Sequence, residues 1–400
     1  MKILMVSPYL PWPLYGGASV RIFNLIKELS NKGHKIILLA GKQNNSDALN
    51  DPLNKLCEQV HLYELPKQGR FLSILRSVFS LSPYPSAQFK NRRLKENFNE
   101  LIEKNQPDLI WINFLFLAEI LSRISLNKIP VVLDQFEADE LVWQRYIKEG
   151  NFIQKLFSYF NLKKIQRLQK KVFERINALL CVSEKEANFM KPKVPSKTNI
   201  LVVPNGVDID FFTPELFLEK LEPIILVAGS MCVLRNINSA IWFAKSIFPK
   251  IKKDIHDAEF WIVGFNPDKK VLTLGKTPGV RVIGTVDDMR LYYKKAKAYV
   301  APFKFGEGTR LKILEAMASG IPIVSTKEGC QGIDIIDGKH VIIADNENDF
   351  ANKVVELLNN NQLAKKLSKN AREFIEQKYS WSKIIDDLDK KILQIIQNNE

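Results

Sequence analysis

The sequence predicts an α/β protein made of two successive domains, each built on a parallel β-sheet. Three observations lead to this prediction. A chain of 400 residues exceeds what one hydrophobic core usually supports. Short apolar, β-branched runs alternate with amphipathic helical segments along the chain. PNGVDIDFFTPE, at 204–215, interrupts this alternation and is typical of a linker. We therefore expect an N-terminal domain at 1–205 and a C-terminal domain at 206–400.

The N-terminal half begins with a strand, a helix and a second strand. KILMVSPYL (2–10) is apolar and ends in a turn, and 13–40 contains a glycine pair, an amphipathic helix and another buried run. Short links between such elements form a βαβ unit, which requires a parallel sheet. Further buried strands are predicted at 108–113, 130–134, 178–183 and 200–205.

The same alternation restarts in the C-terminal half. Amphipathic helices are predicted there, for instance at 238–254 and 286–297. The last segment, 379–399, has apolar residues at helical spacing, and we expect this helix to pack across both domains. The strands predicted between the helices are 223–230, 258–264, 280–284, 298–303 and 321–326.

Composition narrows the class of protein. Hydrophobic residues make up 46% and charged residues 26%, which is ordinary for a soluble globular chain. The four cysteines form no CxxC pair, which argues against a zinc site or a disulfide framework and suits a reducing compartment. MKILMVSPYLPWP has too short an apolar run for a signal peptide, and no run reaches the ~18 residues of a membrane span. We expect a cytoplasmic protein.

The net charge of +14 belongs mainly to the N-terminal half. Residues 1–200 hold 30 basic and 18 acidic side chains, whereas residues 201–400 hold 28 and 26. Residues 151–200 alone hold 11 basic and three acidic side chains. This asymmetry indicates one basic surface and an anionic partner. No signature of a nucleic-acid-binding domain accompanies the charge, so we expect no nucleic-acid partner.

One segment, FGEGTRLKILEAMASGIPIVSTKEG at 305–329, has the features of an anion site. Its loop follows a strand and leads into a helix, so the free N–H groups of the helix face the carboxyl edge of the sheet, where ligands bind. Arg310 and Lys312 add positive charge, while Glu307 and Glu315 suit ligand hydroxyls. The segment therefore predicts a nucleotide-sugar pocket. The alternative is that Glu315 merely stabilises the helix start and the two cations are solvated.

The same segment resembles the nucleotide-sugar signature of the retaining family 4 glycosyltransferases, including the spacing of its two glutamates. Other motifs follow the order of this family, and they cover essentially the whole chain. The resemblance implies the GT-B fold, in which two Rossmann-like domains face a central cleft and the C-terminal helix crosses back to the N-terminal domain. The matching motifs are KILMVSPYLPWPLYGGASVRIFNLIKELSNKGHKI, ALLCVSEKEANFM, VVPNGVDIDFFTP, ILVAGSMCVLRNINSAIWFAKSIFPKI, WIVG, VRVIGTVDDMRLYYKKAKAYVAP and KYSWSKII.

The resemblance also implies roles for individual residues. Glu315 would bind the ribose hydroxyls of the donor, and Glu307 would lie beside its sugar and phosphates. Arg235 and Lys312 would supply positive charge to the pyrophosphate as it leaves. The remaining donor-binding residues implied are Gly16, Gly17, Gly229, Gly284, Gly308, Thr309, Arg310 and Leu311.

The sequence departs from the family pattern at three places. Ser230 stands where many members have an arginine, so the positive charge for the pyrophosphate would come from Arg235 or Arg310. EGTR replaces the common EGFG, so the residues that follow Glu307 differ from those of many family members. No histidine follows the fourth strand, so Asp134 is the predicted catalytic group on the acceptor side; the alternative is that it caps the next turn.

Transfer from a nucleotide sugar needs mainly positive charge at the leaving diphosphate. No Asp-x-Asp-type pair occurs in a matching loop, so we expect a metal-independent hexosyltransferase with no cofactor beyond the nucleotide-diphosphate sugar as co-substrate. The resemblance implies retention, a glycan or lipid-linked acceptor and a role in bacterial surface polysaccharide synthesis. Two alternatives share the fold and donor site: a sugar-nucleotide epimerase or hydrolase, and a non-catalytic nucleotide-sugar-binding module.

Two basic, aromatic-rich stretches suggest a second partner. Residues 152–180 have a helical pattern with apolar residues set against many Lys and Arg, and 69–95 is similar in composition. One interpretation is a peripheral contact with anionic lipid at the inner face of the plasma membrane. The other is an ordinary packed helix with a basic solvated side.

Overall fold

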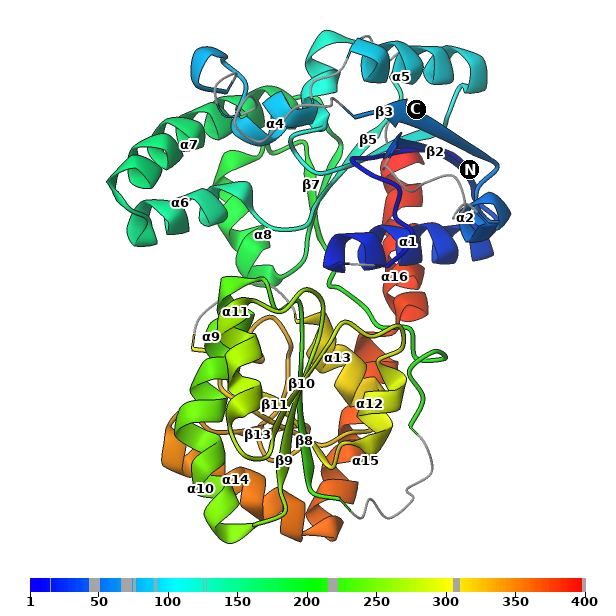
Figure 1. Ribbon diagram of the computed structural model, residues 1–400. Coiled ribbons are helices and arrows are strands. Elements are labelled where there is room, and N and C mark those ends of the chain that lie inside the picture. Colours follow the sequence, from blue (N-terminus) through cyan, green and yellow to red (C-terminus); the bar gives the residue numbers. More distant parts are fainter. Residues whose placement is uncertain are drawn as a thin grey trace. The chain divides into compact units, whose positions relative to one another are not determined.

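The computed structural model describes residues 1–14, 16–42, 51–65, 74, 77–89, 92–124, 126, 128–214, 222–304 and 310–397. They form two compact units (Figure 1). The first unit contains Met1–Pro204 and Ile385–Glu400, and the second contains Asn205–Ile384. The boundary falls within the linker-like stretch that begins at residue 204.

The first unit is built on a parallel sheet in the order β3-β2-β1-β4-β5-β6-β7. The interior strands are buried along nearly their whole length, as expected for a sheet covered on both faces. The strands are β1 (Lys2–Ser7), β2 (Lys35–Lys42), β3 (Gln59–Glu64), β4 (Leu109–Asn113), β5 (Val131–Gln135), β6 (Ala178–Cys181) and β7 (Asn199–Val202).

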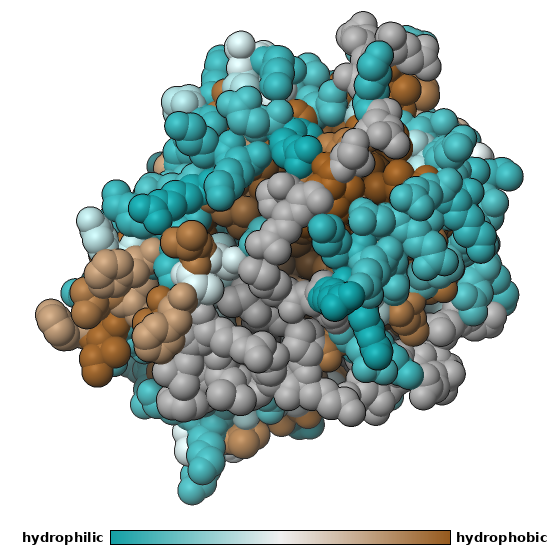
Figure 2. Space-filling view, turned by 90° about the horizontal axis from the view of Figure 1, so that it is seen from above, coloured by the Kyte–Doolittle hydropathy of each residue, from teal (hydrophilic) through white to brown (hydrophobic). Residues whose placement is uncertain are grey.

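Helices connect these strands. The longest, α7, follows α6 after a turn at Gly150, and this turn lies at an edge of the unit where Figure 2 shows hydrophobic side chains on the surface. The helices are α1 (Gly17–Asn31), α2 (Asp51–Leu56), α4 (Tyr84–Phe89), α5 (Arg92–Asn105), η2 (Ala118–Arg123), α6 (Asp139–Glu149), α7 (Phe152–Phe173), α8 (Glu184–Met190) and η3 (Lys191–Lys193).

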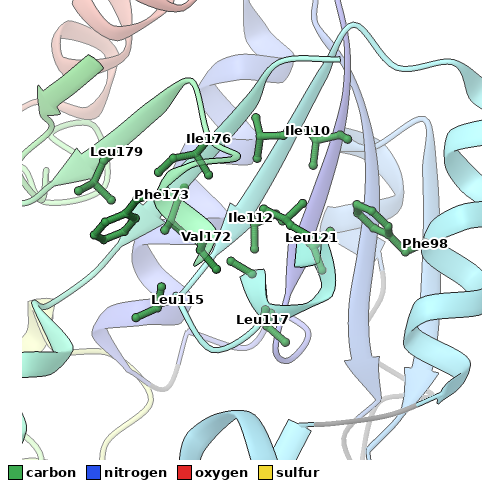
Figure 3. Packing of buried hydrophobic residues seen from close by; sticks show 14 of the residues in the cluster. Phe98, Ile110, Ile112, Leu115, Leu117, Leu121, Val172, Phe173, Ile176 and Leu179 are labelled. Atoms are coloured by element: carbon green, nitrogen blue, oxygen red, sulfur yellow. The ribbon is translucent and has the colours of Figure 1, made fainter. Parts of the chain in front are cut away.

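The core of the first unit lies between the sheet and these helices. Figure 3 shows Ile110 and Ile112 of β4 directed toward Phe98 of α5 and Val172 of α7. Each of these side chains is completely or almost completely buried. The C-terminal part of α7 is therefore an integral part of the fold.

The second unit has a parallel sheet in the order β10-β9-β8-β11-β12-β13. Successive residues of β8 belong to different core clusters: Ile225 and Val227 to one, Ile224 and Leu226 to the other. Because side chains alternate along a strand, this sheet is packed on both faces. The strands are β8 (Ile224–Ala228), β9 (Glu259–Val263), β10 (Val280–Gly284), β11 (Ala298–Ala301), β12 (Ile323–Ser325) and β13 (Ile342–Ile343).

The predicted helix at 238–254 is divided by a π-helical turn, η4, before Pro249 at the start of α10. The predicted helix at 286–297 shortens to α12. The helical elements are α9 (Leu234–Trp242), η4 (Phe243–Ile247), α10 (Phe248–Asp254), α11 (Lys269–Leu272), η5 (Thr273–Lys276), α12 (Arg290–Lys295), α13 (Leu311–Ala318), α14 (Glu347–Asn359), α15 (Asn361–Lys378) and α16 (Trp381–Gln397).

The last helix, α16, begins in the second unit and continues in the first from Ile385. An ion pair and a hydrogen bond hold its C-terminal part to the segment between α1 and β2. Lys32 Nζ lies 2.5 Å from Asp386 Oδ1, and His34 Nε2 lies 2.8 Å from Asp389 Oδ1. The predicted return of the C-terminal helix to the N-terminal domain is confirmed. In the part of the chain that the structure describes, no helix is both long and apolar enough to span a membrane.

Candidate active site

In the second unit, strand order reverses beside β8. The chain passes from β8 to β9 and β10 on one side, then returns to place β11 on the other side of β8. In open α/β sheets, ligands bind at such a reversal, next to the carboxyl ends of the two strands. The segments that leave these ends are 229–235, which opens α9, and 302–315, which contains the start of α13. Both were predicted to bind the donor.

Three glycines at the ends of β8, β9 and β10 bring these backbones together. Gly229 N–H donates to Val263 O at 3.1 Å, and Gly264 N–H donates to Gly284 O at 2.8 Å. Gly264 has φ +154°, and a Cβ there would lie 1.6 Å from Gly229 O, so only glycine fits. Sequence reasoning had named Gly229 and Gly284 and quoted WIVG without using its glycine.

Arg235 occupies the first turn of α9, directly after the Gly229 loop. Its side chain is half-buried, and its Nε has no hydrogen-bond partner among the described residues. The first turn of α9 contains no acidic residue. The positive end of the helix and the guanidinium of Arg235 therefore both favour a negatively charged group. A buried guanidinium N–H without an acceptor favours an anion at this position.

The loop that enters α13 is described from Arg310 onward. Glu307, Gly308 and Thr309 lie outside the described residues, so their predicted roles stay predictions. Arg310 is the N-cap residue of α13, is 9% exposed, and its Cζ lies 3.9 Å from the ring centroid of Phe303. It is therefore not a solvated surface cation. Leu311 begins the helix, and its backbone N–H is among those that a helix start leaves for another acceptor.

Glu315 is buried inside α13 and both of its oxygens are engaged. Lys312 Nζ lies 3.0 Å from Oε1 and 2.7 Å from Oε2, and the hydroxyl of Tyr293 donates to Oε2 at 3.1 Å. Tyr293 comes from α12, and burial together with the nearby carboxylate raises its pKa well above 10, so the hydroxyl keeps its proton. Sequence reasoning missed Tyr293, because its only signal was an aromatic residue in an amphipathic helix.

Gly16 and Gly17 lie where the chain leaves β1 and enters α1. Gly16 is the N-cap residue, with extended backbone at φ −161°, and a Cβ on it would meet nothing within 4 Å among the described atoms. The local fold therefore does not require glycine at this position. The predicted contact of both glycines with donor phosphates stays a prediction.

Asp134 forms a buried ion pair with Arg21. It is the second-last residue of β5, its carboxylate is completely buried, and Arg21 of α1 binds it, with Nε 2.9 Å from Oδ2 and Nη2 2.9 Å from Oδ1. Arg21 Nη1 also donates to Val203 O at 2.9 Å. The predicted acceptor-side role and the alternative of a turn cap stay predictions beside this geometry. It favours a structural ion pair.

Aromatic side chains gather beside the reversal of strand order in the first unit, between β1 and β4. Phe114 directly follows β4 and has φ +75°, which is uncommon for a bulky residue and concentrates at functional sites. Its ring lies 4.3 Å from that of Phe136 and 5.1 Å from that of Phe116, measured between centroids. All three are half-buried. Sequence reasoning gave these three residues no role.

Comparison with known proteins identifies the family. Residues 15–211 match the model described as Glycosyltransferase Family 4, and residues 222–360 match the model described as Glycosyl transferases group 1. The chain belongs to the family 4 glycosyltransferases. It is thus a glycosyltransferase of a family that uses nucleotide-sugar donors.

Relatives and solved structures extend this result over the full length. An uncharacterized 44.6 kDa protein in the cps region of Klebsiella pneumoniae is 23% identical and covers 98% of this chain and 99% of its own. Sucrose-phosphate synthase from Thermosynechococcus elongatus has a TM-score of 0.73 at 16% identity, with complete coverage of both chains. Anabaena HepE in complex with UDP-glucose has a TM-score of 0.68 at 14% identity and covers 98% of this chain and 100% of its own. The fold is GT-B, with two Rossmann-like sheets, as predicted.

Proposed function

We propose that this family 4 glycosyltransferase moves a hexosyl group, with retention, from a nucleotide-diphosphate sugar to a glycan or lipid-linked acceptor in bacterial surface polysaccharide synthesis. The observation that carries the proposal is the buried carboxylate of Glu315, oriented by Tyr293 and Lys312 beside the strand reversal. A capsule-region relative supports the pathway class. The complex of HepE with UDP-glucose supports the donor class. The scattered cysteines support a cytoplasmic reaction.

The proposed mechanism starts from the ion pair that Lys312 and Glu315 form in the absence of the donor. Ribose hydroxyls that donate to Glu315 would replace the hydrogen bonds from Lys312. The ammonium group, one helical turn nearer the start of α13, is then available to the diphosphate. Together with Arg235 and the N–H groups at the start of α13, it stabilises the negative charge that forms when the bond between the anomeric carbon and the phosphate oxygen breaks. The oxygen of the acceptor hydroxyl forms the new bond to the same carbon, and its proton passes to the departing diphosphate. Glu307 keeps its proposed place beside the donor sugar.

On the acceptor side, we propose that the half-buried rings of Phe114 and Phe136 contribute contacts. They follow β4 and β5 at the carboxyl edge of the first sheet, where ligands of such sheets bind. Asp134 leaves the proposed set of catalytic groups, because Arg21 occupies its carboxylate.

Donor binding is tested by a thermal-shift panel of UDP-, GDP-, ADP- and dTDP-sugars on three proteins: the wild type, Glu315→Ala and Glu356→Ala. Glu356 is the matched control, since it also pairs with a lysine three residues away, Lys353, but lies exposed on α14. A donor at ~100 times its Kd should stabilise the wild type by about 2.7 kcal/mol, a shift of several degrees. We expect Glu356→Ala to keep the shift and Glu315→Ala to lose it. No shift with any sugar nucleotide would refute the donor site.

Turnover separates the proposal from its alternatives. An epimerase or hydrolase would consume or rearrange the donor at its full rate with no acceptor present, and a binding module would leave the donor intact under all conditions. The proposed transferase requires donor consumption to rise when an acceptor glycan or lipid-linked acceptor is added.

A further inference from the structure

The start of α7 projects an apolar surface away from the core. We call Phe152, Ile153, Leu156 and Phe160 the apolar tip. Phe152 is 81% exposed and Ile153 is 77% exposed, although both are large hydrophobic residues. Figure 2 shows hydrophobic side chains gathered at the edge where Figure 1 places the α6–α7 turn. Contiguous exposed apolar surface of this kind marks an interaction site.

The apolar stripe of α7 divides into two parts with different environments. Ile165, Leu168, Val172 and Phe173, toward the C-terminal end, are buried in the core of the first unit. The apolar tip belongs to the same helix but is exposed. The ordinary packing of the helix therefore explains only its C-terminal part.

The helix start that carries the tip is well formed. The side chain of Asn151 accepts from Gln154 N–H at 2.9 Å, and the side chain of Gln154 accepts from Asn151 N–H at 3.0 Å, which completes a capping box. Beneath the tip, the ring of Phe157 packs against those of Trp143 and Tyr84. The exposed residues are thus held on a rigid element.

A second exposed apolar group lies against the same part of α7. Lys164 Nζ donates to Ser77 O, and Asn161 Oδ1 accepts from Tyr84 N–H at 2.7 Å, so the 77–84 segment packs on this helix. Within that segment, Phe79 is 87% exposed and Leu81 is 80% exposed. The segment belongs to the stretch 69–95, part of which lies outside the described residues.

Charge decides between possible occupants of this surface. The 22 residues of α7 contain six Lys or Arg and no acidic residue. Lys155 stands within the tip and Lys163 follows it, with its Nζ 5.7 Å from the ring centroid of Tyr159. Two copies of so basic a face would repel each other, whereas an anionic lipid surface offers charge of the opposite sign together with an apolar layer.

We propose that the apolar tip inserts into the interface of an anionic bilayer while the lysines around it contact lipid head groups. Helices with this division of residues lie with their apolar side chains ~5–10 Å into the boundary between head groups and acyl chains. The surface also narrows the acceptor to a lipid-linked one, and this second step rests on the proposed glycosyl transfer.

The test is co-sedimentation of the full chain with vesicles of phosphatidylcholine alone or mixed with phosphatidylglycerol. We compare the wild type with Phe152→Ser/Ile153→Ser, which changes only exposed side chains at the helix start. The matched control is Leu272→Ser/Leu291→Ser in the second unit, whose side chains are 53% and 56% exposed. We expect the wild type and the control to bind the anionic vesicles and the tip variant to bind about tenfold or more weakly.

Each outcome decides the proposal. Equal binding of the tip variant and the wild type, equal binding to both kinds of vesicle, or no binding to anionic vesicles would overturn it. A wild-type dimer that the tip substitutions dissociate would assign the surface to self-association instead. The donor-induced thermal shift is measured on the same variants and should be unchanged. A failure of vesicle binding is thereby distinguished from a failure of the proposed sugar transfer.

Discussion

The ion pair between Arg21 and Asp134 makes the sharpest prediction about a residue first predicted to be catalytic. Both side chains are 0% exposed, and three Arg21–Asp134 contacts lie between 2.9 and 3.2 Å. Asp134→Asn keeps the shape but leaves the buried guanidinium without its counter-charge. Removing one partner of a buried ion pair costs about 3–5 kcal/mol. We expect the lower end of this range, because the asparagine oxygen still accepts a hydrogen bond.

Urea unfolding of the full chain, followed by far-UV circular dichroism, measures this loss in the transition of the first unit. The double substitution Arg21→Met/Asp134→Leu serves as the control. It removes both charges together, and such replacements are often neutral, so most of the stability should return. Asp134→Asn with stability within about 1 kcal/mol of the wild type, but without acceptor-dependent turnover, would refute the structural role.

Other consequences of the site and the core are testable in the same way. Tyr293→Phe removes the hydroxyl that orients Glu315 and should weaken donor binding about 5–10-fold in calorimetry; an equal loss for a 2′-deoxy donor would contradict a role at the ribose. Gly264→Ala places a Cβ 1.6 Å from Gly229 O, so we expect a lower Tm and loss of the donor-induced thermal shift. An unchanged Tm would contradict the close approach of the ends of β8 and β9. Burial raises the pKa of Glu186 to about 7, above the 4.5 expected on unfolding, so unfolding releases a proton between these values. The stability of the wild type should therefore fall, by up to about 1.4 kcal/mol per unit, as the pH rises from about 4.5 to about 7, relative to Glu186→Gln. Urea midpoints at pH 5 and 7.5 measure this difference, and a difference of the opposite sign would contradict the assigned pKa.

Periodicity and motif order predicted the two parallel sheets because interior strands of such sheets are continuous apolar runs, as in β1 and β8. They missed β3, an edge strand with partly exposed residues, and β13, which has two residues. Neither strand carries the fully buried pattern on which the prediction depended.

Site residues within one local segment were easier to predict than those brought together by the fold. Glu315 and Lys312 are three residues apart on one helix, so their proximity follows from helical geometry. Tyr293 reaches Glu315 from α12, and Arg21 reaches Asp134 across 113 positions of the chain. A carboxylate at the carboxyl end of a strand suggested an acceptor-side group, whereas its contact with Arg21 could not be predicted from the local sequence.

The Lys312–Glu315 pair explains why one segment carries charges of both signs at a helix start. A carboxylate buried there for ribose would pay a desolvation cost in the free protein, and a lysine kept there for a diphosphate would repel the positive end of the helix. Pairing them at 2.7 Å offsets both costs until the donor binds. In the proposed mechanism the donor carries hydroxyl donors for the glutamate and negative charge for the lysine, so it would replace both halves of the pair in one event. A sugar phosphate without the nucleoside would offer only the second replacement, so the proposed mechanism makes the ion pair itself a source of selectivity for the whole nucleotide sugar.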